Sequence, residues 1–173
     1  SGPGEMLLVG KTVDDAAGEA YDKVSKFLGL GYPGGPLVEQ LARKAVKRKV
    51  FFPKILTDPG DTRFSYSGIK TAVINHLKAN PDDDLSEVVY SFQESALELL
   101  TRRLFTAARN EKIKTMVVAG GVAANGRLHS LFLFSYFYRH RAARPKKAVS
   151  FSRFLSLRIP ADAYRNRHRF PHP

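Results

Sequence analysis

Four carboxylates lie within one short stretch of the sequence and could contact a hydroxylated ligand or a metal ion. They are Asp14, Asp15, Glu19 and Asp22. Asp15, Glu19 and Asp22 are spaced i, i+4 and i+7, which places them on one face of a helix. Ionised carboxylates accept hydrogen bonds from hydroxyl groups and also coordinate hard cations. The competing interpretation is a well-capped, solvent-exposed helix face that binds nothing.

Two double-glycine turns expose bare backbone that a ligand could approach closely. The first, at 34–35, follows the acidic stretch, and the second, at 120–121, lies between an expected strand at 115–119 and a helix that begins near Asn125. Strand, glycine pair and helix N-terminus together form a common arrangement for binding a phosphate or nucleotide. We expect both turns to face one ligand. Either pair could also be a turn and nothing more, with Asn125 a plain helix N-cap.

A Ser-x-x-Lys spacing at Ser67 and Lys70 resembles that of a serine nucleophile with a lysine base. The pattern is common by chance, and the one histidine outside the C-terminal region, His76, falls on the same expected helix. No catalytic triad is therefore available. We interpret these residues as the start of a capped helix, with Lys70 as an anion contact.

Hydrophobic spacing and helix-ending residues predict a helix-rich α/β domain that positions these groups. The expected elements, in chain order, are a strand at 5–10, a helix from Thr12 to Gly29 or Gly31, a helix at 36–49, a helix at 69–79, a long amphipathic helix at 86–109 and a buried strand at 115–119. Asp14 and Asp15 would lie in the first turn of the first helix, where the macrodipole favours negative charge.

Composition excludes several classes of protein. The 173 residues include no cysteine, which excludes disulfides and thiolate metal sites. No apolar run reaches the roughly 18 residues that a membrane span needs, and the N-terminus lacks a signal-peptide pattern. We therefore expect a cytoplasmic protein with no membrane partner.

The net charge of +12 is concentrated at the C-terminus. Residues 129–173 contain ten Lys or Arg and a single acid, Asp162, whereas residues 1–128 are nearly balanced. This basic, aromatic tail shows no sustained helical or alternating pattern. We expect two parts, 1–128 as the folded domain and 129–173 as a tail that is disordered or not the original C-terminus. The alternative is a tail that binds single-stranded nucleic acid by charge and stacking.

Four motifs give the sequence a specific resemblance. In chain order they are DDAAGEAYDK at 14–23, GLGYPGGP at 29–36, FSYSGIKT at 64–71 and AGGVAAN at 119–125. Together they resemble the tRNA threonylcarbamoyladenosine transferase family, TsaD in bacteria, formerly called O-sialoglycoprotein endopeptidase or glycoprotease. The resemblance extends over residues 5–128.

The resemblance implies a fold and a reaction. The fold would be an incomplete second lobe of the actin, sugar kinase and Hsp70 (ASKHA) type, helix-rich α/β, with nucleotide held between two lobes. The family transfers a threonylcarbamoyl group from threonylcarbamoyl-adenylate to N6 of adenosine 37 in tRNAs that read ANN codons, releasing AMP. Its partners would be tRNA, a TsaB-like paralogue and a TsaE-like ATPase.

Site residues follow from the same motifs. The resemblance implies that the adenylate or ATP is contacted by Asp22, Gly35, Glu39, Gly120, Gly121 and Asn125. It identifies no catalytic residue. The family's iron or zinc ligands, two histidines in the first lobe and an aspartate in a Thr-Asp-Asn motif, are missing from this sequence. We therefore expect no metal site in this fragment and no activity of the fragment alone.

Two other functions remain open at this stage. One is a non-catalytic nucleic-acid-binding module that acts through the basic tail. The other is an ATP-dependent sugar kinase of the same fold superfamily, which gives no account of the acidic motif or of the Ser-Gly-Ile-Lys-Thr segment. We also expect self-association through apolar surface that the missing lobe would otherwise cover.

Overall fold

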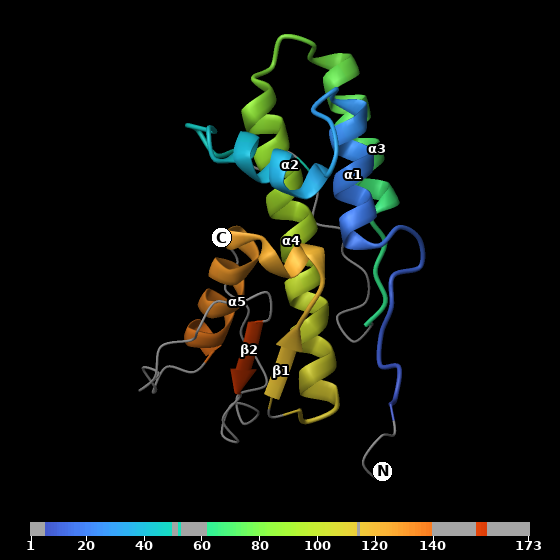
Figure 1. Cartoon of the computed structure of the whole chain (residues 1–173), viewed down its shortest axis with the longest axis vertical. Coiled ribbons are helices and arrows are strands. Elements are labelled where there is room, and N and C mark those ends of the chain that lie inside the picture. The colour runs from blue at the N-terminus through green and yellow to red at the C-terminus, as the bar shows by residue number, and fades with distance from the viewer. Residues whose placement is uncertain (1–5, 50–51, 53–61, 114, 140–154, 159–173) are drawn as a thin grey trace. The chain divides into compact units, whose positions relative to one another are not determined.

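The computed structural model describes residues 6–49, 52, 62–113, 115–139 and 155–158, without side-chain detail at 136–139 and 155–158. It divides into two compact units, Ser1–Ala107 and Ala108–Pro173. Within the described residues, the helix-rich α/β character predicted from the sequence is confirmed (Figure 1). No helix among these residues has the length and apolarity to cross a membrane.

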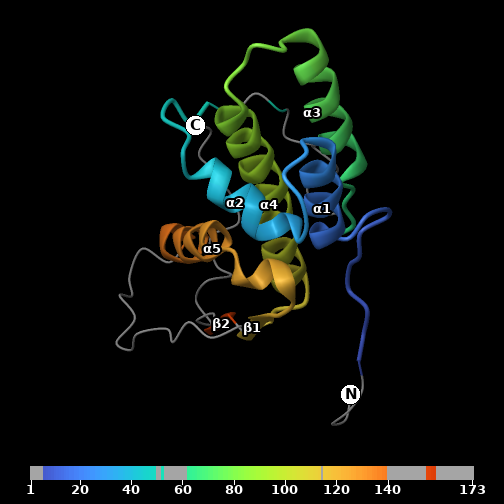
Figure 2. The ribbon, with the colours of Figure 1, turned by 45° about the horizontal axis from the view of Figure 1, so that its top comes forward.

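The first unit is built from helices. It contains α1 (Ala17–Phe27), α2 (Gly34–Ala42), α3 (Ser67–Ala79) and most of α4 (Leu85–Asn110). Helix α1 packs against both α2 and α3, and Figures 1 and 2 show α1 and α3 side by side. The Tyr21 ring of α1 meets the Phe92 ring of α4 edge to face, with centroids 5.1 Å apart.

The core of this unit is formed by the apolar faces of these helices. Its fully buried side chains include Tyr21, Val24, Val38, Ile69, Val73, Val88, Phe92 and Leu97. Helices α3 and α4 match their predicted ranges to within two residues, since their apolar residues recur at helical spacing. Asn80 and Pro81 follow α3, as expected.

Helix α1 begins later than the sequence predicted. Its N-cap is Ala16, so Asp14 and Asp15 precede the helix instead of lying in its first turn. The prediction failed because the Asp14 side chain hydrogen-bonds to another segment of the chain. The predicted glycine stop is confirmed, since the helix ends at Phe27 and Gly29 adopts a left-handed φ of 68°.

Helix α2 is shorter than the predicted helix at 36–49, because it starts at Gly34 and ends at Ala42. Pro36 is tolerated as its third residue, since the first N–H groups of a helix have no intrahelical partner. Beyond Ala42 the backbone N–H groups of Val46 and Lys47 donate to the Glu87 carboxylate of α4, at 2.7 and 2.6 Å. These bonds replace the intrahelical bonds of a longer helix.

The predicted strand at 5–10 is absent from its described residues 6–10. Met6, Leu7 and Leu8 are 99%, 78% and 74% exposed. A strand needs a hydrogen-bonded neighbour, and the nearest pairing among the described residues is an isolated parallel bridge between Thr12 and Phe64.

The second unit contains a two-stranded antiparallel sheet and a helix. Strand β1 (Thr115–Val118) pairs with β2 (Leu155–Arg158), in a register that places Thr115 opposite Arg158. A short 3-10 helix (Gly121–Ala124) leads into α5 (Gly126–Arg139). The strand predicted at 115–119 is confirmed, although Val117 is 62% exposed and only Met116 of β1 is buried.

The C-terminal region differs from the prediction at two places. The sequence pattern predicted no regular element after Leu128, but α5 continues to Arg139, and residues 155–158 form β2. Strand β2 was missed because four residues carry too little pattern to identify a strand. Most of the remaining tail lies outside the described residues, so its proposed non-native origin stays a prediction.

Candidate functional site

The acidic residue Asp22 fixes the first glycine turn. It projects from the middle of α1, and its Oδ1 accepts a hydrogen bond from the Gly34 N–H at 2.7 Å. On the same helix, the buried Ser25 hydroxyl donates to the Gly31 carbonyl at 2.8 Å. Two side chains of α1 therefore hold the segment that leads into α2.

The two glycines of this turn have different roles. A Cβ atom on Gly34 would lie 2.6 Å from the Tyr21 carbonyl oxygen and 2.7 Å from the Asp22 Cα, so no other residue fits against α1. A Cβ on Gly35 would meet nothing within 4 Å. Gly34 is thus required by packing, whereas Gly35 presents open backbone to any molecule beside the turn.

An open hollow of about 430 Å³ lies next to this turn. Its lining residues come from α1 and the segment after it: Glu19, Asp22, Lys23, Lys26, Gly29, Gly31 and Tyr32. The lining combines carboxylates, ammonium groups and the exposed Tyr32 ring. Such a set can bind a ligand that has hydroxyl groups, negative charge and an apolar ring.

Glu39, the remaining predicted residue of this turn region, lies on α2. Its Oε1 accepts from Arg43 at 2.6 Å, and its side chain is 15% exposed. The Arg43 side chain is 72% exposed and can move with little loss of packing. A ligand hydroxyl could therefore replace Arg43 as the donor to Glu39.

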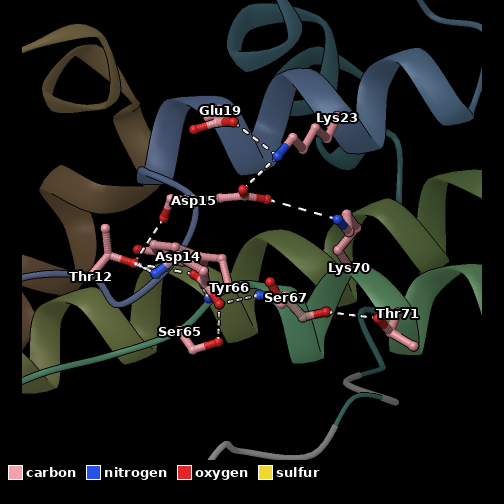
Figure 3. A network of polar contacts seen from close by, with 10 residues as sticks. All are labelled: Thr12, Asp14, Asp15, Glu19, Lys23, Ser65, Tyr66, Ser67, Lys70 and Thr71. Atoms are coloured by element: carbon pink, nitrogen blue, oxygen red, sulfur yellow. Dashed lines mark hydrogen bonds and ion pairs between the residues drawn. The ribbon is translucent and has the colours of Figure 1, made fainter.

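The predicted acidic face is incomplete, because Asp15 precedes α1 and only Glu19 and Asp22 lie on that helix. Asp14, which also precedes α1, serves another helix. Its carboxylate accepts hydrogen bonds from the Ser65 hydroxyl and from the backbone N–H groups of Tyr66 and Ser67, the latter two at 2.9 and 3.2 Å (Figure 3). These N–H groups stand at the N-terminus of α3, which has no side-chain cap of its own. Asp14 is therefore the cap of α3, supplied from a segment about fifty residues earlier.

Asp15 lies between two lysines. Lys23 approaches its Oδ1 to 2.5 Å and also pairs with Glu19 at 2.9 Å, while Lys70 lies 3.9 Å from its Oδ2 (Figure 3). The hydrogen bond that Lys23 donates to Asp15 raises the pKa of Lys23, and the bond that it donates to Glu19 adds a smaller increase. The structure thus places Lys70, predicted as an anion contact, beside the carboxylate of Asp15.

The second glycine turn is described within its own unit. Gly120 has a φ of 98°, and a Cβ on Gly120 or Gly121 would meet nothing within 4 Å. The Asn125 side chain is buried, and its Oδ1 accepts from the N–H groups of Arg127 and Leu128 at 2.9 and 3.0 Å. Asn125 is therefore the N-cap of α5, and this bonding fixes the direction of its amide group.

His129 supports the same turn from the first turns of α5. Its Nε2 donates to the Ala123 carbonyl oxygen at 2.5 Å, which ties the 3-10 helix to α5. The sequence alone does not predict this contact, because a lone histidine carries no signal that points to a backbone carbonyl. The capping role of Asp14 and the packing role of Gly34 likewise leave no signal in the sequence.

None of the described residues forms a group of three or more histidine, aspartate or glutamate side chains able to hold a metal ion. The acidic residues 14, 15 and 22 each face a different partner, as shown above. The metal that the family resemblance implies therefore does not fit this part of the structure, and no chemical step is assigned to it.

Comparison with known proteins identifies the family of this chain. The family model described as TsaD, tRNA N6-adenosine threonylcarbamoyltransferase, matches residues 1–156, and the chain belongs to that family. The resemblance given by the four motifs is thus confirmed, and the match continues past Leu128. Membership of this family implies the ASKHA-type fold, and this chain corresponds to part of that fold.

Two curated relatives carry the name tRNA N6-adenosine threonylcarbamoyltransferase. The protein from Thermotoga neapolitana is 46% identical over 123 residues, which is 71% of this chain and 38% of the relative. The protein from Thermosipho melanesiensis is 48% identical over 121 residues, or 70% of this chain and 37% of the relative. The chain therefore matches less than two fifths of the length of either relative.

Proposed function

We propose that this chain carries part of the adenylate-binding site of a tRNA threonylcarbamoyltransferase. The complete enzyme would transfer a threonylcarbamoyl group from threonylcarbamoyl-adenylate to N6 of adenosine 37 in tRNAs that read ANN codons, releasing AMP. The partners of that enzyme would be tRNA, a TsaB-like paralogue and a TsaE-like ATPase. The names of the two relatives support the reaction class.

The observation that carries this proposal is the turn held by Asp22. The carboxylate is already bonded to the Gly34 N–H, so the neighbouring Gly35 is presented in a fixed position with open space before it. A preformed turn binds its ligand without the entropic cost of ordering the backbone. A bare glycine also lets an adenylate approach the main chain more closely than any side chain would allow.

Each residue would have a defined task. The free oxygen of Asp22 would accept from a ribose hydroxyl, and Glu39 would accept from a second one after Arg43 moves aside. Within its own unit, the second turn would offer Asn125 and the open glycines 120 and 121 as adenylate contacts. The chain alone would bind the adenylate without transferring it, since it matches less than two fifths of the length of either relative.

A matched pair of glycine variants tests this proposal by calorimetric titration with ATP and with a stable threonylcarbamoyl-adenylate analogue. Gly35→Ala adds a methyl group into open space, so we expect a folded protein with at least tenfold weaker ligand binding. Helical stability should not fall, because alanine is favoured over glycine in a helix by about 0.5–1 kcal/mol. Gly34→Ala should instead destabilise the fold, since its methyl group meets the α1 backbone.

Asn125 offers a second pair. Asn125→Asp keeps the oxygen that caps α5 but replaces the amide nitrogen, so it should fold and bind the analogue more weakly. Asn125→Ala also removes the cap, at a cost of about 1 kcal/mol in stability. Unchanged affinity in both Gly35→Ala and Asn125→Asp, or no binding by the unmodified chain, would contradict the proposal.

A further inference from the structure

Residues 43–49, the basic loop, form a dense positive patch directly after α2. The segment reads RKAVKRK and holds five cations with no acid: Arg43, Lys44, Lys47, Arg48 and Lys49. All five are exposed. Figure 1 shows the loop, in cyan, leading away from the helices of its unit. The net charge of the whole chain does not reveal this patch, because most of that charge comes from the C-terminal tail.

The basic loop has a fixed backbone. Glu87, a buried residue of α4, accepts hydrogen bonds from the N–H groups of Val46, Lys47 and Lys49 at 2.7, 2.6 and 3.3 Å. Ala45 is buried as well. The Glu87 carboxylate therefore bonds to the backbone of the loop and holds it in place. The cationic side chains of the loop stay exposed to solvent.

Arg48 shows how strongly this shape is imposed. Its φ is 51°, in the left-handed region, which is unfavourable for a residue with a Cβ. The contacts of the neighbouring residues with Glu87 offset that cost. The guanidinium group of Arg48 therefore projects from one defined backbone position.

Few acidic groups neutralise the basic loop. Arg43 is paired with Glu39 at 2.6 Å. Asp84 has a lowered pKa, mainly because of hydrogen bonds from Ser86 and to a smaller extent because of the charge of Lys47. Lys44, Arg48 and Lys49 have no ion pair within the described part of the chain. An outward-facing group of cations on a fixed backbone is suited to a partner with regularly spaced negative charges.

We propose that the basic loop binds the phosphate backbone of tRNA. This inference rests on the proposed function, which supplies a tRNA as the molecule to be modified. Arginine and lysine contacts to phosphates position a nucleic acid without reading its sequence. The loop would therefore orient the tRNA, while other groups select the base.

The position of the loop fits this task. Helix α2 connects the glycine turn at its start to the basic loop at its end, and its nine residues span about 13 Å at 1.5 Å per residue. A nucleic-acid strand whose phosphates contact the loop could therefore extend along α2 towards the glycine turn. A tRNA held by the loop would thus have nucleotides within reach of the Gly35 turn.

Binding of an unmodified tRNA transcript that reads an ANN codon, measured over a range of salt concentrations, tests the inference in the full chain. The loop variant combines Lys44→Gln, Lys47→Gln, Arg48→Asn and Lys49→Gln, where asparagine tolerates the left-handed φ. Arg43 is kept because it contacts Glu39. Each phosphate contact contributes about 0.7–0.9 to the slope of log K against log salt. We therefore expect the slope to fall by roughly 3 and the affinity to fall at least tenfold.

The control variant removes the same charge from exposed positions elsewhere. It combines Lys11→Gln, Lys78→Gln, Arg109→Gln and Lys112→Asn, and Lys112 shares the φ of 51° found at Arg48. We expect its slope and affinity to stay close to those of the unmodified chain. Circular dichroism melts of both variants verify that they fold. Loss of tRNA binding in both variants to the same extent, or in neither, would overturn the inference.

A third variant separates the loop from the tail. Replacing Arg141, Arg144, Lys146 and Lys147 with glutamine removes four charges from the tail. If this variant loses tRNA binding while the loop variant keeps it, the tail is the RNA contact and the inference is wrong. Titration of the loop variant with the adenylate analogue should give unchanged affinity. Adenylate binding and tRNA binding are thus measured separately, so failure of one proposal is distinguishable from failure of the other.

Discussion

Asp14 and Asp22 show how two aspartates of one motif serve different purposes. Asp14 accepts three hydrogen bonds at the start of α3 and has little freedom to contact anything else. Asp22 accepts a hydrogen bond from the Gly34 N–H and lines an open hollow. Of the two, only Asp22 combines a fixed position with access for a ligand. Asp14 instead caps α3, and the motif alone could not distinguish this structural role from ligand binding.

The capping role of Asp14 predicts a pH-dependent contribution to stability. Partial burial acts to raise its pKa, but the hydrogen bonds from Ser65, Tyr66 and Ser67 outweigh this and hold the pKa far below its ordinary value of 3.8. A lowered folded-state pKa means that the stabilisation is complete above the ordinary pKa and is lost as the pH falls through the folded-state value. Protonation of Asp14 should therefore weaken the attachment of α3.

Urea denaturation of the unmodified chain and of Asp14→Asn measures this effect. Asparagine keeps an acceptor oxygen but does not titrate, so its capping is independent of pH. The free energy of unfolding of the unmodified chain should exceed that of Asp14→Asn most clearly near neutral pH. The difference should shrink below about pH 4. Two stability curves that run parallel from neutral to acidic pH would contradict the role assigned to Asp14.

Helix α2 and the basic loop illustrate how one distant side chain sets the limits of an element. The residues after Ala42 have helix-forming side chains, and the sequence predicted a helix up to residue 49. The loop forms because Glu87, about forty residues away, offers its carboxylate to several backbone N–H groups. A charge-assisted hydrogen bond contributes about 1.5–3 kcal/mol, more than the preference for one helical turn.

Glu87→Ala should therefore destabilise the chain by about 2–4 kcal/mol, because it leaves these N–H groups without their acceptor. Glu87→Gln should cost less, since one amide oxygen remains. Glu19→Ala is the matched control: its side chain is 54% exposed and pairs with Lys23 on the surface, so about 0.5 kcal/mol or less is expected. Urea denaturation measures all three. Hydrogen exchange should also quicken at Val46 and Lys47 in Glu87→Ala, and unchanged exchange there would disprove the anchoring role.

Local pattern predicted the elements whose limits depend on their own residues. Helices α3 and α4 were found because long amphipathic spacing and the Asn80-Pro81 stop act locally. The start of α1 and the end of α2 were misplaced, because each depends on a carboxylate that bonds to a segment far away in the sequence. The candidate site also depends partly on local pattern and partly on contacts between distant segments. The motifs predict Asp22 and Gly35 as ligand contacts, but only the structure separates Gly35 from the packing residue Gly34.

At the scale of the whole molecule, the described N-terminal segment leaves apolar side chains in water. Met6, Leu7 and Leu8 are among the most exposed large apolar residues, and Val13 is 61% exposed. Contiguous exposed apolar residues mark an interaction surface or a site of aggregation. Residues 6–8 are therefore suited to pairing with another copy of the chain.

The isolated chain should therefore self-associate as its concentration rises. Sedimentation velocity over a wide concentration range would show an increasing average mass, because each exposed leucine or methionine gains roughly 1.5–3 kcal/mol on burial. Leu7→Lys combined with Leu8→Lys should shift this association to higher concentration, since charged side chains on an exposed extended segment oppose pairing between chains. Lys11→Gln and Lys78→Gln, which remove charge without changing the apolar segment, should leave the association unchanged or strengthen it. A strictly monomeric chain at all concentrations would mean that residues 6–8 do not form an interaction surface, and the apolar segment would then need another explanation.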